Sequence, residues 1–445
     1  MLRITGQALI STMNLVSADP LRADDQGVQL RVGREKEARW IIDRLINSDG
    51  HIFIGGDPGV GKTSLANNVA FELAEETHRR SEPGTVFIMA EGPIHVESSS
   101  TAESIRNEFY ALILKSIQNN DAILPGHVKT RSKIRKLSAW LDTPMLRSGQ
   151  VTVGIQPVTL GGGGGWQANT SAGFARHGFS GHVDAILDEL HESGVSLICM
   201  MDNLERIGKV GDASRLLEDV RDSILSARAV KWIVCGAGGV SVAVQKPSLA
   251  GKFGQPILLE PLEGGDFQET FLKRMSGSAN ALSHIELPST IVSTFLERAG
   301  GNVRDAFRLL ESFRGWLIQL QNEMGVSLAT ESIDDEDWRS AVEDFMSQYV
   351  EDYDDLLESL SDSVITTLLR IHASQKSVLL GDYSSFGVER IEDFIDHCDI
   401  LEASGFLVKF IKLGNREPAY MMTCEGFLVA EFSTVEKVSR IQLSL

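Results

Sequence analysis

The feature that most constrains this chain is the segment GDPGVGKT at residues 56–63. It fits the pattern GxxxxGK[ST], follows a short apolar run at 51–54 and precedes a helical pattern at 64–74. Between a strand and a helix, the glycines let backbone N–H groups curl around phosphate oxygens, and the helix presents its positive end to the same anion. The segment therefore predicts a phosphate-binding loop at the edge of a parallel α/β sheet.

The loop residues have distinct predicted roles in binding ATP. Lys62 can reach the β- and γ-phosphates, and the Thr63 hydroxyl can ligate Mg²⁺. We expect the nucleotide to contact nine consecutive residues: Gly56, Asp57, Pro58, Gly59, Val60, Gly61, Lys62, Thr63 and Ser64. The alternative, a chance match in an ordinary loop, is disfavoured because the strand, the loop and the helix are all in place.

A second motif is an acid at the end of another apolar strand. The apolar run 195–201 is followed directly by Asp202, which would lie beside the phosphate loop and hold Mg²⁺ through water. The alternative is an aspartate that simply ends a buried strand. A water-activating base is normally a carboxylate, yet the next residue is Asn203 and the next acid is Glu205. Either Glu205 is that base, or the site hydrolyses slowly and works as a nucleotide-controlled switch.

Strand and helix patterns alternate over the first 260 residues. Further strands are predicted at 85–89, 231–235 and 256–259, and further helices at 32–47, 105–117 and 213–228. This alternation predicts an α/β fold, with a parallel sheet covered by helices on both faces. The pattern is entirely helical from 266 to 321, so the sheet domain is expected to end near Pro261.

Three other segments stand out by their composition or their sequence pattern. Residues 150–176 include five consecutive glycines and are interpreted as a hairpin insertion, or alternatively as an element that orders on assembly. Residues 331–358 carry twelve acids against Arg339, which is typical of a solvated helix face or a linker. Residues 359–445 show two helical patterns followed by strand, turn and strand, the order of a winged helix.

Four motifs together carry a family resemblance. They are Val32-Gly33-Arg34-Glu35, the phosphate loop, Asp202-Asn203-Leu204-Glu205, and the segment GGNVRDA at 300–306. In this order they resemble AAA+ ATPases of the origin-recognition-complex-like group and the neighbouring STAND signalling ATPases. The resemblance implies a P-loop domain with a helical lid, and an appended winged helix fits both groups. The expected units are 1–29 (an arm), 30–262 (the P-loop ATPase domain), 263–330 (the lid), 331–358 (an acidic linker or helix) and 359–445 (the winged helix).

The resemblance also implies roles for individual arginines. Arg304 would be the second sensor, reaching from the lid toward the γ-phosphate; the alternative is an exposed arginine at a helix start. An arginine finger donated across a subunit interface could be Arg221, Arg228 or Lys252, although a surface salt bridge is the alternative for each. The family's first sensor is a polar residue at the end of the fourth strand. Here that strand ends in Ile-Val-Cys-Gly at 233–236, which departs from the family's pattern.

Charge and cysteine content bear on partners and compartment. The chain has a formal net charge of −19, which argues against a protein that coats nucleic acid. The expected recognition helix, 389–402, has six acids against Arg390, so we expect it to pack against protein rather than to read DNA. Wing-to-phosphate contact stays open through Lys409, Lys412 and Arg416. Four scattered cysteines favour a reducing cytoplasm, and no membrane span is expected.

The sequence thus predicts a regulatory ATPase that binds ATP and Mg²⁺, with Lys62, Asp202, Glu205 and Arg304 as catalytic candidates and Thr63 and Asp202 as metal ligands. Its nucleotide state would control a homo-oligomer or an effector protein, in DNA transactions or antiphage defence. Two alternatives stay open. One is a DNA-loading ATPase, and the other is a scaffold that binds ATP without hydrolysing it.

Overall fold

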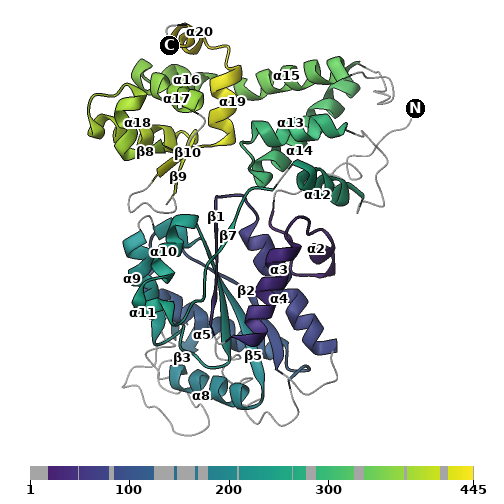
Figure 1. Ribbon diagram of the computed structural model, residues 1–445, viewed down its shortest axis with the longest axis vertical. Helices are drawn as coiled ribbons and strands as arrows, with labels where there is room; N and C mark the ends of the chain where they lie inside the picture. The colour runs from purple at the N-terminus through teal and green to yellow at the C-terminus, as the bar shows by residue number, and fades with distance from the viewer. Residues whose placement is uncertain are drawn as a thin grey trace.

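A parallel five-stranded sheet forms the centre of the first domain (Figure 1). The structure is a computed structural model and describes residues 19–48, 50–79, 85–124, 145–147, 166–168, 179–207, 210–262, 264–276, 287–324, 335–374, 378–410 and 419–443. The strands are β1 (Ile52–Gly56), β2 (Val86–His95), β5 (Val195–Asp202), β6 (Val230–Gly236) and β7 (Ile257–Leu259). Their order is β2-β5-β6-β1-β7, and every pairing is parallel. The predicted α/β fold is confirmed.

The central strands are buried on both faces because helices cover the sheet on each side. Alternate side chains of β1 point to opposite faces, so Ile54 and Phe53 belong to two different cores. Helices α3 (Glu35–Asn47) and α4 (Lys62–Arg79) pack on the Ile54 face, and α5 (Ala102–Asn119), α8 (Phe179–Glu192) and α9 (Val210–Arg221) on the Phe53 face. Every residue of β1 and of β5 is buried, which explains their nearly unbroken apolar sequences.

The expected arm and the helix predicted at 213–228 both differ from the sequence prediction. Within the expected arm, residues 25–29 form helix α2 (Asp25–Gln29), which packs on α4. The preceding turn is fixed to α4 as well, because the Leu21 N–H donates to Ser64 Oγ at 3.0 Å and Asn67 Nδ2 donates to the Leu21 carbonyl at 2.9 Å. The helix predicted to reach residue 228 ends at Arg221, and turns lead from there to Ala229, which has a φ of +61°.

The predicted lid is a set of helices that follows β7. It contains α12 (Gly264–Ser276), α13 (Ser289–Arg298) and α14 (Val303–Met324). The acidic segment forms α15 (Asp335–Glu351) and α16 (Asp354–Ser359). Its acids are solvated, but Trp338, Phe345 and Met346 on the other side of α15 are buried against the lid. The segment therefore joins the lid to the following module, because an apolar stripe runs along the acidic helix.

The C-terminal module combines helices with a small antiparallel sheet. Its elements are α17 (Asp362–Ser374), β8 (Val378–Leu379), the 3₁₀ helix η5 (Leu380–Phe386), α18 (Ile391–Ala403), β9 (Leu407–Phe410), β10 (Ala419–Met422), α19 (Cys424–Phe432) and α20 (Glu436–Gln442). The sheet order is β8-β10-β9. This arrangement is compatible with the winged-helix interpretation. The tip of the expected wing, with Lys412 and Arg416, lies outside the described residues.

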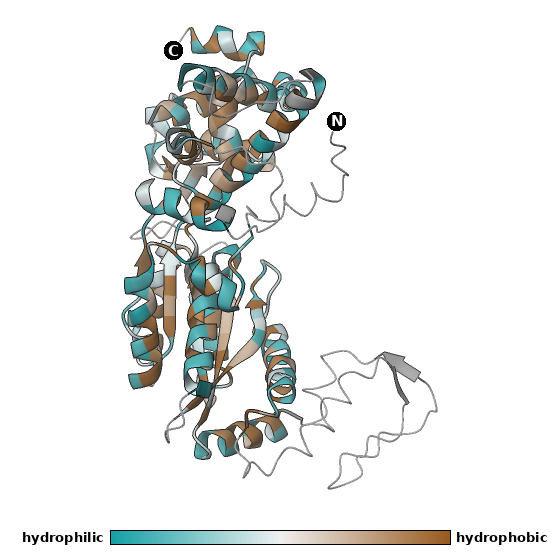
Figure 2. Ribbon diagram, turned by 90° about the vertical axis from the view of Figure 1, so that its right-hand side faces the viewer, coloured by the Kyte–Doolittle hydropathy of each residue, from teal (hydrophilic) through white to brown (hydrophobic). Residues whose placement is uncertain are grey.

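One continuous hydrophobic core runs through the lid and the C-terminal module. It joins Phe295 and Phe313 of the lid to Phe345 of α15 and Leu428 of α19. Figure 2 shows the consequence: these helices form one body stacked on the sheet domain along the long axis of the molecule. The predicted phosphate loop lies where the two bodies meet.

Little of the glycine-rich segment lies within the described residues. A short strand before it, β3 (Met145–Arg147), pairs antiparallel with a short strand within it, β4 (Trp166–Ala168), with Arg147 opposite Trp166. Within 150–176, the described residues are those of β4. In the part of the chain that is described, no helix has the length and apolarity needed to cross a membrane.

Candidate nucleotide-binding site

The site lies at the carboxyl edge of the parallel sheet, at the end of β1. Gly59 and Gly61 have φ values of +78° and +97°, which only glycine adopts without strain, so the loop can turn its N–H groups inward. The side chain of Lys62 is buried, and its Nζ donates to the carbonyls of Gly56 and Asp57, at 3.0 Å each. This ammonium holds the curve of the loop and places a positive charge at its centre.

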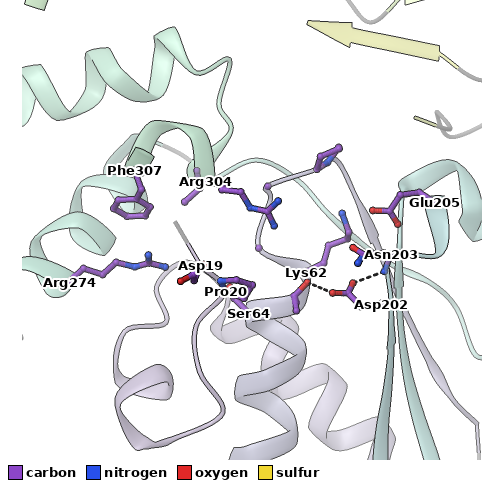
Figure 3. Close-up of a pocket in the computed structure, with 15 residues that line it drawn as sticks. Asp19, Pro20, Lys62, Ser64, Asp202, Asn203, Glu205, Arg274, Arg304 and Phe307 are labelled. Atoms are coloured by element: carbon purple, nitrogen blue, oxygen red, sulfur yellow. Dashed lines mark hydrogen bonds between the residues drawn. The ribbon is translucent and has the colours of Figure 1, made fainter. Parts of the chain in front are cut away.

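The strand β5 delivers Asp202 to the same edge. The Thr63 hydroxyl donates to Asp202 Oδ2 at 2.8 Å, although the two residues are 139 positions apart (Figure 3). Asp202 is 6% exposed, and its Oδ1 accepts the N–H of Asn203 at 2.9 Å. A threonine hydroxyl and a carboxylate held this close are oxygen donors of the type that Mg²⁺ takes from proteins, with phosphates and water completing its shell.

Within the described residues there is no group of three or more histidine, cysteine or acidic side chains that could hold a metal ion by itself. Mg²⁺ in proteins is usually bound by one or two carboxylates together with substrate phosphates and water. When bound, Mg²⁺ would neutralise charge on the β- and γ-phosphates. Thr63 and Asp202 are the residues that would hold it.

The lid closes the pocket from the opposite side. Arg304, at the start of α14, reaches toward the phosphate loop, and Arg274 and Phe307 lie at the other end of the pocket (Figure 3). The cavity measures about 100 Å³. The lining residues are Asp19, Pro20, Pro58, Gly59, Gly61, Lys62, Thr63, Ser64, Asp202, Asn203, Glu205, Arg274, Val303, Arg304 and Phe307.

Most of the predicted site residues therefore meet in one pocket. Lys62, Thr63, Asp202, Glu205 and Arg304 all line it.

Three of the nine predicted loop residues do not line the pocket. Gly56 and Asp57 turn their carbonyls toward Lys62, and the Val60 side chain belongs to the core beneath the loop. These residues shape the loop from behind.

The residues after Asp202 have an unusual local geometry. Asn203 has a φ of +63°, which asparagine tolerates better than most residues. Its Nδ2 lies 3.4 Å from Nδ1 of His95 at the end of β2. Glu205 follows in the 3₁₀ helix η2 (Leu204–Ile207), with Oε2 buried and without a hydrogen-bond partner among the described residues. This carboxylate faces the pocket from a position where it could accept a proton.

The place of the first sensor is taken by Cys235 near the end of β6. Its thiol is fully buried, and burial, reinforced by Asp202 and Glu205 and opposed by Lys62, raises its pKa well above the ordinary value. The thiol is therefore neutral, and thiols are weak hydrogen-bond donors. The position beside the pocket thus offers only a weak hydrogen-bond donor.

The three candidate arginine-finger residues lie at the opposite edge of the sheet, where strands β6 and β7 begin. Arg221 is exposed and pairs with Asp222 at 2.8 Å, and Arg228 pairs with Asp188 at 3.6 Å. The Lys252 carbonyl accepts the His51 N–H at 2.7 Å, just before β1. Within one chain, none of the three reaches the phosphate loop.

Sequence reasoning missed the far end of the pocket. Burial lowers the pKa of Arg274 to about 10, and its guanidinium carbon lies 4.3 Å from the centre of the Phe307 ring. Asp19 and Pro20 come from the segment expected to be an arm. The sequence pattern places Phe307 and Arg274 on two different helices. Nothing in either pattern indicates that the two side chains are in contact. The sequence patterns likewise do not indicate the contact between Asn302 and the phosphate loop.

Comparison with known proteins agrees with this geometry. Residues 17–146 match the family model described as the AAA domain. The matched residues include the phosphate loop and the strands β1 and β2. No curated protein matches the chain.

Several solved archaeal structures are similar to this chain at low identity. The Aeropyrum pernix ORC2 protein in ADPNP–ADP complexes has 14% identity and a TM-score of 0.43, and the match covers 93% of this chain and 94% of that one. The Aeropyrum pernix ORC1 protein in complex with DNA has 14% identity and a TM-score of 0.42, covering 92% and 94%. Cdc6p from Pyrobaculum aerophilum has 12% identity and a TM-score of 0.39, covering 96% and 97%.

Proposed function

We propose that this chain is an Mg²⁺-dependent ATPase whose nucleotide state controls its assembly or its engagement of a partner. The observation that carries the proposal is the 2.8 Å hydrogen bond between Thr63 and Asp202 beside Lys62, in a pocket that Arg304 enters from the lid. A phosphate group in the loop would meet inward-facing N–H groups, one ammonium and one guanidinium. Such charge-assisted contacts are the strong ones in phosphate recognition.

The rate of hydrolysis is proposed to be low. Efficient attack needs a base that orients water and a donor that stabilises the developing charge. Here Asn203 follows Asp202, Cys235 holds a neutral thiol, and Glu205 is the next carboxylate along the chain that lines the pocket. These features support a slow nucleotide-controlled switch. They also favour the second candidate, a scaffold that holds ATP without turnover.

The partner is proposed to be a protein, either a second copy or an effector. Helix α18 supports this choice because its cation, Arg390, is bound to Asp393 at 2.5 Å. Asp399 also has partners, Lys409 at 3.4 Å and the Tyr420 hydroxyl at 2.7 Å. The surface of the helix stays acidic and would be repelled by a DNA groove. A charge reversal at Asp393 and Asp396 that leaves assembly unchanged would count against this choice.

The broader setting is proposed by analogy alone. A regulatory role in DNA transactions or antiphage defence would suit such a switch. All four cysteines are buried and unpaired, and we propose a reducing compartment because they are scattered along the sequence without a CxxC pair. The DNA-loading ATPase remains the alternative, and its hallmark would be hydrolysis stimulated by DNA.

The test is ATP turnover and molecular mass measured on the same samples, for wild type and Lys62→Ala, with and without DNA. Turnover that Lys62→Ala abolishes, together with an ATP-dependent mass change, would support the switch. Stimulation by DNA would favour the loader. Tight ATP binding with neither turnover nor mass change would favour the scaffold and contradict the switch.

A further inference from the structure

We propose that Arg34 is a positioning residue that couples the phosphate loop to the hinge of the lid, so that a nucleotide in the loop moves the lid and the C-terminal module as one body. This inference rests on the proposed nucleotide site, and it assigns a role to the Val32–Glu35 motif.

The contacts of Arg34 join segments that are remote in sequence. Its Nη2 donates to the carbonyl of Val60 in the phosphate loop at 3.2 Å and to the carbonyl of Glu260 at 2.5 Å. Its Nη1 lies 3.5 Å from Glu37, which holds the guanidinium in place. Arg34 is only 8% exposed, and burial lowers its pKa, an effect that Glu37 opposes. Burying a charged guanidinium costs free energy, and the cost stays low only while its hydrogen bonds to both backbone carbonyls are kept.

Glu260 stands at the hinge of the lid. It directly follows β7, the last strand of the sheet, and precedes α12, the first helix of the lid. Gly33, the residue before Arg34, lies against the first lid helix. It has a φ of +68°, and a Cβ added there would lie 2.5 Å from Asp266 Oδ2 on α12. The pair Gly33-Arg34 thus touches the loop, the hinge and the first lid helix.

A second contact holds the lid on the loop directly. Gly59 lies against the side chain of Asn302, so closely that a Cβ at Gly59 would be 1.8 Å from Asn302 Oδ1. Next to it, Gly301 lies against Pro261 of the hinge, where a Cβ added to the glycine would lie 3.7 Å from the proline Cβ. The pocket beneath this contact measures about 100 Å³. Typical ligand pockets have roughly 300–1,000 Å³, and a lid that moves away from the loop would enlarge this one.

Arg34 can transmit that movement. A phosphate that binds the loop N–H groups reorients the loop peptides, including the one whose carbonyl Arg34 holds. Because the same Nη2 holds Glu260, a shift of the Val60 carbonyl is passed to the hinge. A ligand can move the lid only through such contacts that differ between the two lid positions.

The C-terminal module would follow the lid because α19 is attached to it at both ends. Arg308 of α14 bonds Glu425 at the start of α19, and Arg298 of α13 bonds Glu431 near its end. Arg298 also lies over the Phe432 ring at 5.1 Å. Together with the shared core, these bonds make the lid and module one body. A change at the phosphate loop therefore reaches the surface of α18.

The experiment measures lid movement separately from ATP binding. Cysteines introduced at Ile123 on the sheet domain and at Leu272 on α12 carry a fluorescent donor–acceptor pair, since these side chains are 37% and 62% exposed and the native cysteines are buried. Energy transfer and ATP affinity are recorded with and without ATP for wild type, Arg34→Gln and Arg34→Lys. The matched control is Arg44→Gln, because Arg44 lies on helix α3, whose N-cap is Arg34, and donates to the Gln255 carbonyl at 2.6 Å without touching the loop.

Wild type and Arg44→Gln are expected to show the same ATP-dependent change in energy transfer. Arg34→Gln should bind ATP less than about tenfold more weakly, since Arg34 does not line the pocket, and yet lose most of the change. Arg34→Lys should show an intermediate change, because a lysine ammonium is a compact donor that lacks the fork of a guanidinium.

A full change in Arg34→Gln, or an equal loss in Arg44→Gln, would overturn the role of Arg34. If wild type binds ATP but its energy transfer does not change, the role of Arg34 is overturned as well. Wild type that binds no ATP would instead refute the nucleotide site itself, so the two failures are distinguishable. If Arg34→Gln does not fold, the test is made with Arg34→Lys. An ATP-dependent change in energy transfer as large as that of wild type would overturn the proposal, and a smaller change with ATP affinity retained would support it.

Discussion

Alanine at Gly59 would break the direct contact between the phosphate loop and the lid. The glycine has a φ of +78°, and an added Cβ would lie 1.8 Å from Oδ1 and 2.5 Å from Cγ of Asn302. Asn302 cannot simply turn away, because the same Oδ1 accepts the N–H groups of Arg304 at 3.1 Å and Asp305 at 3.3 Å. It is therefore the N-cap of α14. Gly59→Ala must either lift the lid or remove this cap.

The magnitude follows from these two effects. Left-handed backbone costs a non-glycine residue about 1–2 kcal/mol. Loss of an asparagine cap costs typically about 1 kcal/mol. Gly59→Ala should thus destabilise the protein by about 2–3 kcal/mol, and Asn302→Ala alone by about 1 kcal/mol. In the double variant the cap is lost only once, so its cost should fall short of the sum of the single costs by about 1 kcal/mol.

The assay is thermal unfolding of wild type, both single variants and the double variant, without nucleotide. Each kcal/mol should shift the midpoint by roughly 2–4 °C. Gly61→Ala provides the control, since Gly61 also has a positive φ, +97°, but an added Cβ there would meet nothing within 4 Å. Gly61→Ala should be additive with Asn302→Ala. Additivity of Gly59→Ala with Asn302→Ala to within about 0.5 kcal/mol would refute the contact.

Three further predictions concern catalysis and pH. Asp202→Asn should abolish the Mg²⁺ dependence of ATP binding and lower turnover at least about 100-fold, because the metal keeps only Thr63; unchanged turnover in a phosphate-release assay would contradict this. Asn203→Glu should raise turnover by about tenfold or more by supplying a base, and a rate equal to wild type would leave Glu205 as the candidate. His51, whose pKa burial lowers to about 4, is neutral in the fold, with Nε2–H donating to the Leu225 carbonyl and Nδ1 accepting the Trp232 N–H. The unfolded state therefore takes up the proton first, so stability present above about pH 6.5 should fall by about 2 kcal/mol between pH 7 and pH 5. Urea unfolding of His51→Gln should lack this component, and an identical pH slope in both proteins would contradict it.

The fold could be predicted where local sequence decides the structure. The apolar run at 195–201 becomes a fully buried strand because helices cover both faces of the sheet. The phosphate loop could be predicted because its glycines, Lys62 and Thr63 are adjacent in sequence. Asp202 could be placed because the carboxyl ends of parallel strands lie at one edge of the sheet.

The remaining features depend on contacts between distant elements. The acids of α15 indicate a solvated helix, whereas its position follows from the stripe with Trp338 and Phe345, which packs on the lid. Arg274 enters the pocket only because the lid folds over the loop, and no pattern within α12 indicates that. Asn302 belongs to a motif that the sequence shows, but its contact with Gly59 is a property of the assembled lid.

The most direct test of the nucleotide site is calorimetric titration of ATP into wild type and Lys62→Ala, each with Mg²⁺ and with EDTA. Wild type should bind ATP with Mg²⁺ and more weakly without it, because Thr63 and Asp202 then hold no ion. Lys62→Ala should lose about tenfold or more in affinity, as expected for one charge-assisted contact of about 1.5–3 kcal/mol. Equal affinities in the two proteins, or no binding by wild type, would contradict a nucleotide site between the loop and the lid.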